Sequence, residues 1–188
     1  MPKNIAIFAS GSGSNAENII RFFSRSDLFH FPVIVSNRAD AFVHRRAEDL
    51  NIRSVTFGRK EFETGEAVLE LLREYRVDAI VLAGFLLKVP ELLIDAFPER
   101  IINIHPALLP KYGGKGMYGD HVHKAVRASG DTESGITIHY VNKHYDEGAV
   151  VFQATCAIEP SDSYEDIARK VHALEYEHFP KVIEMIFG

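Results

Sequence analysis

One stretch of the chain carries an amide and an imidazole, and an acidic loop follows it downstream. The stretch is Asn103-Ile104-His105, and the loop runs from Tyr145 to Gly148 with Asp146 inside it. An amide N–H stabilises a developing oxyanion, an imidazole adds positive charge or moves a proton, and a carboxylate raises the pKa of a neighbouring imidazole. These residue types favour acyl or formyl transfer, with Asn103, His105 and Asp146 as catalytic groups and with His105 kept cationic by Asp146.

The residues before Pro106 must orient this amide and imidazole. Ile101 to His105 predicts a short buried strand that ends at the proline. Side chains two residues apart in a strand face the same side, so Asn103 and His105 are expected to point together. The spacing alone leaves open a second interpretation, in which both are turn and packing residues at a strand end.

A glycine-rich turn near the N-terminus is a second candidate for chemistry. The apolar strand 5–9 leads into Ser10-Gly-Ser-Gly-Ser-Asn15, and residues 16–23 have helical spacing. Glycines let the backbone approach a phosphate, and a helix N-terminus supplies partial positive charge. Three interpretations remain open: a phosphomonoester site, an NADP site in which Arg38 meets the 2'-phosphate, and a structural tight turn.

Strand and helix patterns alternate through the first half of the chain. The expected strands are 33–35, 55–57 and 79–83, and the helices that follow them are 41–50, 67–75 and 90–97. Such alternation predicts a parallel sheet covered by helices, with ligands beyond the carboxyl ends of the strands. The glycine-rich turn and His105 both lie at such ends.

The second half predicts a different arrangement. Residues 136–141 alternate in polarity and residues 149–158 follow a turn, which favours an antiparallel pair. Residues 161–163 can cap a final helix, which Pro180 is expected to kink or interrupt. We therefore predict an α/β fold, with a Rossmann-like, mostly parallel sheet, helices on both faces and an antiparallel C-terminal strand pair. Residues 1–188 are expected to form a single domain.

Composition excludes several classes of partner. The net charge is −5 and Lys and Arg form no block, which argues against nucleic acid. The sequence has neither a signal peptide pattern nor an apolar run of membrane-spanning length, so we expect a cytoplasmic protein without a membrane partner. His121 and His123 beside Asp120 are too few for a closed zinc site, and we expect no metal. They are either helix-opening residues at the edge of the cleft or ordinary surface histidines. His139 is either a cleft residue or a satisfied core histidine.

The run from Asn103 to Pro110 resembles the folate-dependent formyltransferases. Similar motifs are the glycine-rich turn, Ser36 to Ala41, and Leu82 to Phe85, so the resemblance covers nearly the whole chain. It implies formyl transfer from 10-formyltetrahydrofolate as co-substrate. Within the family the likeness is greatest to members that formylate the glycinamide amine of a ribose-phosphate substrate in purine synthesis. Direct attack of the amine would give a tetrahedral intermediate.

The resemblance also implies two binding regions. Gly13, Ser14 and Asn15 would hold the substrate phosphate, and His172 with Glu175 would meet its ribose or glycinamide part. The residues that would bind the folate, mainly through their backbone, are Leu86, Leu87, Lys88, Val89, Asn103, Asn142 and Asp146. We expect only small-molecule partners, in a monomer or a homodimer.

Three departures from the family pattern concern the edges of this site. The loop 111–119 is longer than in many members, and a Leu-Lys pair at 87–88 stands where Arg-Ile is common. Gly65 occupies the place of an arginine found in several members, for which Arg59 or Lys60 are candidate substitutes.

Two relatives and one unrelated class supply the alternatives. A deformylase of 10-formyltetrahydrofolate would use the same catalytic residues but carries an extra N-terminal domain. A formyltransferase acting on tRNA would carry a C-terminal nucleic-acid-binding domain and a basic surface. On length and charge we expect neither. An NADP-dependent nucleotide-binding protein is the alternative from another class.

Overall fold

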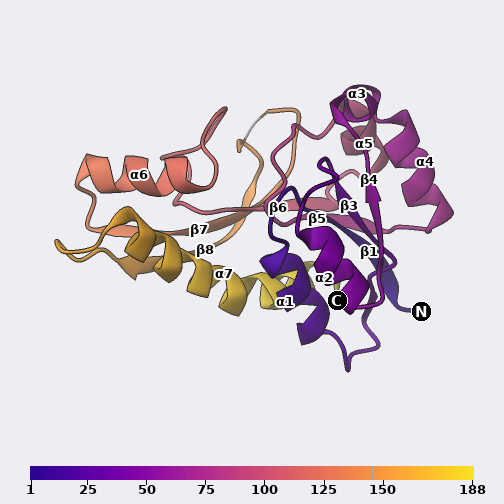
Figure 1. Cartoon of the computed structure of the whole chain (residues 1–188), viewed down its shortest axis with the longest axis horizontal. Coiled ribbons are helices and arrows are strands. Elements are labelled where there is room, and N and C mark those ends of the chain that lie inside the picture. The colour runs from indigo at the N-terminus through magenta and orange to yellow at the C-terminus, as the bar shows by residue number, and fades with distance from the viewer. Residues whose placement is uncertain (145) are drawn as a thin grey trace.

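The computed structural model describes residues 1–144 and 146–188, so Tyr145 of the predicted acidic loop lies outside the described residues. In the described part of the chain all strands join one sheet (Figure 1), in the order β4-β3-β1-β5-β6-β7-β8. The short β2 pairs with β1. The strands are β1 (Lys3–Phe8), β2 (Phe29–His30), β3 (Val33–Ser36), β4 (Arg53–Thr56), β5 (Ala79–Leu82), β6 (Ile101–His105), β7 (Glu133–Tyr140) and β8 (Val150–Ala157).

The predicted sheet is confirmed, with one addition. The pairs among β1 to β6 are parallel, and β7 and β8 form the predicted antiparallel pair. β7 also runs antiparallel to β6, which the sequence pattern did not predict. This second antiparallel contact places His139 directly opposite Asn103.

Helices cover both faces of the sheet, as predicted. Ile5 and Ile7 of β1 join a core with α1, α2, α6 and α7, whereas Ala6 and Phe8 join a core with α3, α4 and α5. Neighbouring side chains of a strand point to opposite faces, so a continuously apolar strand feeds two cores. The helices are α1 (Ser14–Phe22), α2 (Val43–Asp49), α3 (Arg59–Thr64), α4 (Glu66–Glu74), α5 (Glu91–Ala96), α6 (Asp120–Ser129) and α7 (Tyr164–Phe187).

The final helix α7 continues through Pro180, so the proline does not interrupt it. A proline inside a helix has no N–H for the carbonyl four residues earlier, here that of Tyr176. The side chain of Asn18 on α1 donates to this carbonyl oxygen at 3.0 Å. A neighbouring helix therefore satisfies the acceptor that the proline leaves free, and Pro180 itself is buried.

The expected elements of the first half are present, with their ends shifted by at most two residues. The unpredicted helix α3 precedes α4, and Gly65 separates the two with a left-handed φ of 76°. Among the described residues no helix has the length and apolar character needed to cross a membrane. The carboxyl ends of β1, β5 and β6 meet at one edge, where the cleft lies.

Candidate active site

A cleft of about 1140 Å³ opens at this edge of the sheet. Its walls come from the segments that follow β1 and β5, from the end of β6, and from α6, α7 and the loop after β7. Of the predicted site residues, those lining the cleft are Gly13, Ser14, Asn15, Leu86, Leu87, Lys88, Val89, Asn103, His105, Asp146, His172 and Glu175. The sequence-predicted groups are thus gathered in one cavity, with Asn142 the exception.

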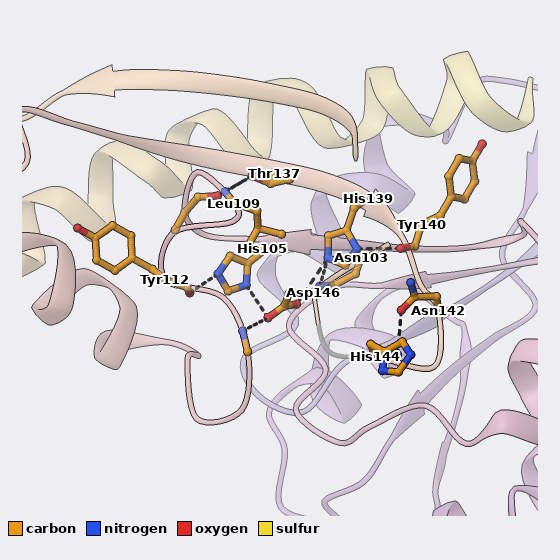
Figure 2. Close-up of polar contacts among 12 residues, drawn as sticks. Asn103, His105, Leu109, Tyr112, Thr137, His139, Tyr140, Asn142, His144 and Asp146 are labelled. Atoms are coloured by element: carbon orange, nitrogen blue, oxygen red, sulfur yellow. Dashed lines mark hydrogen bonds and ion pairs between the residues drawn. The ribbon is translucent and has the colours of Figure 1, made fainter. Parts of the chain in front are cut away.

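The three predicted catalytic side chains lie close together, as Figure 2 shows. Asn103 and His105 extend from β6, and Asp146 approaches them from the loop after β7. Asp146 Oδ2 is 3.7 Å from His105 Nδ1, and Asp146 Oδ1 is 3.6 Å from His139 Nε2. One carboxylate therefore faces two imidazoles.

His139 orients the amide of Asn103 from behind. Its Nδ1–H donates to the carbonyl oxygen of Tyr140 at 2.8 Å, which leaves Nε2 with a lone pair in the neutral ring. Asn103 Nδ2 donates to this lone pair at 3.1 Å. The second N–H of the Asn103 amide stays available for a ligand. His139 is 2% exposed and does not line the cleft, so it is a core histidine that supports a cleft residue.

His105 has a different electrostatic state from the one expected. Burial lowers its pKa, and although the Asp146 carboxylate acts in the opposite direction, burial prevails. The imidazole is therefore neutral in the ligand-free site at neutral pH, not held cationic by Asp146. Its Nε2–H donates to the carbonyl oxygen of Tyr112 at 2.8 Å. Nδ1 consequently presents a lone pair to Asp146.

Asp146 remains ionised next to these rings. Burial raises the pKa of its carboxyl group, whereas positive charge on His139 or His105 and the hydrogen bond from the N–H of Gly114 lower it, and the lowering prevails. The Gly114 N–H donates to Asp146 Oδ2 at 2.9 Å. Asp146 thus also connects the loop after β7 to the loop before α6.

The glycine-rich turn has the geometry of an anion site. Gly13 has a left-handed φ of 72°, and a Cβ there would lie 2.6 Å from the Cβ of Val43, so only glycine fits. Arg46 Nε donates to the carbonyl oxygen of Ser12 at 2.8 Å and anchors the turn from α2. The first backbone N–H groups of α1 begin at Ser14, beside the cleft.

A buried carboxylate joins this turn to the C-terminal helix. Glu175 Oε2 accepts hydrogen bonds from Asn15 Nδ2 and His172 Nδ1, both at 2.8 Å. Glu175 is 9% exposed and lines the cleft. Asn15 and Glu175 are far apart in the sequence, so residue spacing alone does not predict this contact. Their pairing places a carboxylate beside the candidate phosphate site.

Ser10 supports the cleft lining without being part of it, and the sequence analysis did not single it out. It is 1% exposed, its Oγ donates to Asn37 Oδ1 at 2.5 Å, and it accepts from the backbone N–H of Leu86 at 2.8 Å. Its own N–H donates to the carbonyl oxygen of Gly84 at 3.0 Å. Ser10 therefore ties the start of the glycine-rich turn to the segment predicted to bind folate. A serine directly after a buried apolar strand was the available signal.

Several other predicted residues lie outside the lining. Asn142 Oδ1 accepts from the backbone N–H of His144 at 2.8 Å and holds a local turn. Arg38 pairs with Asp40 at 2.8 Å on the surface, which does not favour a 2'-phosphate site. His121 is exposed, and the described residues contain no group of three or more His, Cys, Asp or Glu suited to a metal ion.

The two candidate substitutes for the missing arginine differ in position. Arg59 lines the cleft, whereas Lys60 does not. A Cβ at Gly65 would lie 2.8 Å from the Pro90 side chain, and the φ of Gly65 is positive. A long side chain is therefore strained at this position, and Arg59 is the better placed of the two.

The Rossmann-like sheet carries a cleft in which an amide donor, an imidazole and a carboxylate lie beside a glycine-rich turn, an arrangement suited to group transfer. Residues 3–183 match the family model described as formyl transferase, and the chain belongs to this family.

Two relatives and one solved structure show which members of this family the chain is similar to. A chloroplastic phosphoribosylglycinamide formyltransferase from Arabidopsis thaliana is 38% identical over 98% of this chain, although the chain spans only 65% of that relative. Phosphoribosylglycinamide formyltransferase from Bacillus subtilis is 36% identical and covers 99% of this chain and 95% of its own length. The crystal structure of glycinamide ribonucleotide transformylase 1 from Geobacillus kaustophilus superposes with a TM-score of 0.91, at 32% identity and full coverage of both chains.

Proposed function

We propose that this chain transfers the formyl group of 10-formyltetrahydrofolate to the glycinamide amine of N1-(5-phosphoribosyl)glycinamide, a step of purine biosynthesis. The observation that carries the proposal is the position of Asn103, His105 and Asp146 in one cleft. The anion-binding turn and the Leu86 to Val89 segment line the same cleft, where they are suited to the phosphate and the folate. The names of the relatives support this choice of substrates.

The chemistry follows from the hydrogen-bonding state of each group. The substrate amine attacks the formyl carbon, and the carbonyl electron pair moves to the formyl oxygen. The free N–H of Asn103 donates to this oxyanion. In this mechanism the intermediate is not covalently attached to the enzyme.

Proton transfer completes the reaction. The amine nitrogen becomes cationic on attack. It then loses one proton to the lone pair of His105 Nδ1, which lies 3.7 Å from Asp146 Oδ2. The protonated imidazole beside Asp146 then gives a proton to N10 of the folate as the bond between the formyl carbon and N10 breaks. The products are the formylated amide and tetrahydrofolate. A neutral resting His105 suits this exchange, because it accepts before it donates.

The test is an absorbance assay for tetrahydrofolate formation with and without the ribonucleotide. We expect turnover only with the ribonucleotide, and a loss of about a hundredfold to a thousandfold in kcat for Asn103→Asp, which removes the donor at nearly constant size. Asn51→Gly, which removes an exposed amide outside the cleft at a left-handed residue, is the control. Turnover without the acceptor would indicate a deformylase. No turnover, together with tight NADPH binding in a fluorescence titration, would indicate the nucleotide-binding alternative.

Three broader expectations accompany the proposed activity. Residues 1–188 act as a single formyltransferase domain, the partners are small molecules, and the enzyme works in the cytoplasm without a bound metal. Light scattering distinguishes the monomer from the homodimer.

A further inference from the structure

One buried imidazole at the cleft has no part in the proposed transfer. His123 lies on α6, lines the cleft and is 6% exposed. Its Nδ1 is closed off from solvent and has no hydrogen-bond partner among the described residues. Leaving a buried polar atom without a partner costs stability, so this histidine calls for a functional explanation.

The missing partner decides which ring nitrogen carries the proton. Burial lowers the pKa of His123 despite the opposing charges of Glu175 and Asp120, so the ring is neutral at neutral pH. A neutral ring has one N–H and one lone pair, and a buried N–H without an acceptor is rarer than an unpaired acceptor. The lone pair therefore belongs on Nδ1 and the proton on Nε2. Nε2, unlike Nδ1, is not a buried atom that lacks a hydrogen-bond partner. Because His123 lines the cleft, its Nε2–H faces the cleft.

A matching acceptor lies on the neighbouring helix. α6 packs against α7, and Glu175 on α7 is close enough for its charge to act on His123. Glu175 Oε2 is occupied by Asn15 and His172, whereas Oε1 accepts no hydrogen bond from the residues that the structure describes. The cleft wall thus presents one donor and one acceptor from adjacent helices.

We propose that His123 is a substrate-binding residue whose Nε2–H donates to a hydroxyl of the substrate ribose. It would act beside Glu175, which the family resemblance already assigns to the ribose or glycinamide part and whose Oε1 can accept from the same diol. A vicinal diol donates and accepts at each hydroxyl, so it complements such a pair. A charged lysine at this position would lose its hydration on burial, whereas a neutral imidazole does not carry that cost. The inference rests on the proposed function, because that function supplies the ribose.

Substitutions that move the donor test this role. The amide nitrogen of His123→Gln lies near the position of Nε2, whereas that of His123→Asn is shorter and lies near Nδ1. We expect His123→Asn to raise KM for the ribonucleotide about tenfold, with kcat and the KM for the folate changed less than about twofold. His123→Gln should recover most of this loss. His121→Asn, on the exposed face of the same helix, is the matched control and should behave like wild type.

A thermodynamic cycle with modified substrates identifies the contact. With a glycinamide nucleotide that lacks the 2-hydroxyl or the 3-hydroxyl, the effect of His123→Asn on KM should fall below about twofold for one of the two. Equal KM values for wild type and His123→Asn, or the same loss with both deoxy substrates, would overturn the inference. Circular dichroism and thermal unfolding separate misfolding from lost binding. If wild type itself does not formylate the ribonucleotide, the proposed function fails first, and this result is distinct from unchanged kinetics in the variants.

Discussion

Replacing Ser10 by alanine should weaken both the fold and the folate side of the cleft. The substitution removes two hydrogen bonds of the buried Oγ, to Asn37 Oδ1 and from the Leu86 N–H. Each bond contributes about 1 kcal/mol, and a partner left unsatisfied adds to the cost, so Ser10→Ala should lower the free energy of unfolding by about 2–4 kcal/mol. In a chain of this size, this corresponds to a decrease in Tm of about 4–16 °C.

The same side chain holds the backbone N–H of Leu86, which gives the substitution a kinetic consequence. The KM for 10-formyltetrahydrofolate should rise severalfold, because the Leu86 backbone is no longer held toward the glycine-rich turn. Urea unfolding measures the stability and initial rates measure KM.

Ser134→Ala is a matched control for this experiment. Ser134 is also buried, at 2% exposed, but its Oγ has no hydrogen-bond partner among the described residues. Removing this hydroxyl should cost less than about 0.5 kcal/mol, or stabilise the fold slightly. If Ser10→Ala costs no more than Ser134→Ala, then the two hydrogen bonds do not contribute as reasoned here.

Three further predictions concern charge and helix packing. Because the Asp146 carboxylate raises the pKa of His105 against burial, Asp146→Asn should shift the NMR titration of His105 to lower pH, and an unchanged titration would contradict the coupling. His105 and His123 both have lowered pKa values, so below about pH 6.5 the unfolded chain binds more protons than the folded one. Stability to urea should therefore fall as the pH drops from 7 toward 5, with a smaller slope in His105→Gln; equal slopes would refute this origin. Asn18→Ala should cost about 1 kcal/mol in thermal unfolding but much less in a Pro180→Ala background, where the helix supplies its own N–H; equal costs would exclude the proposed compensation.

Local pattern predicted much of this protein. The continuously apolar strands and the alternating helices predict the parallel part of the sheet, because periodicity and turn residues are properties of neighbouring positions. The same reasoning placed Asn103 and His105 on one side of β6, and both line the cleft. The glycine-rich turn was recognisable for a local reason as well, because the positive φ of Gly13 favours glycine. The family resemblance added Glu175 and His172.

The tertiary structure decided which groups act on one another. Asp146 and His139 meet the β6 residues only through the antiparallel pairing of β7 with β6, and Glu175 reaches Asn15 only because α7 packs against α1. Burial also reversed the expected charge of His105, since desolvation depends on the whole surrounding core and not on sequence neighbours. Residue types and local patterns thus specify which chemical groups are present and which elements hold them. Their distances and protonation states depend on long-range packing, which residue spacing does not specify.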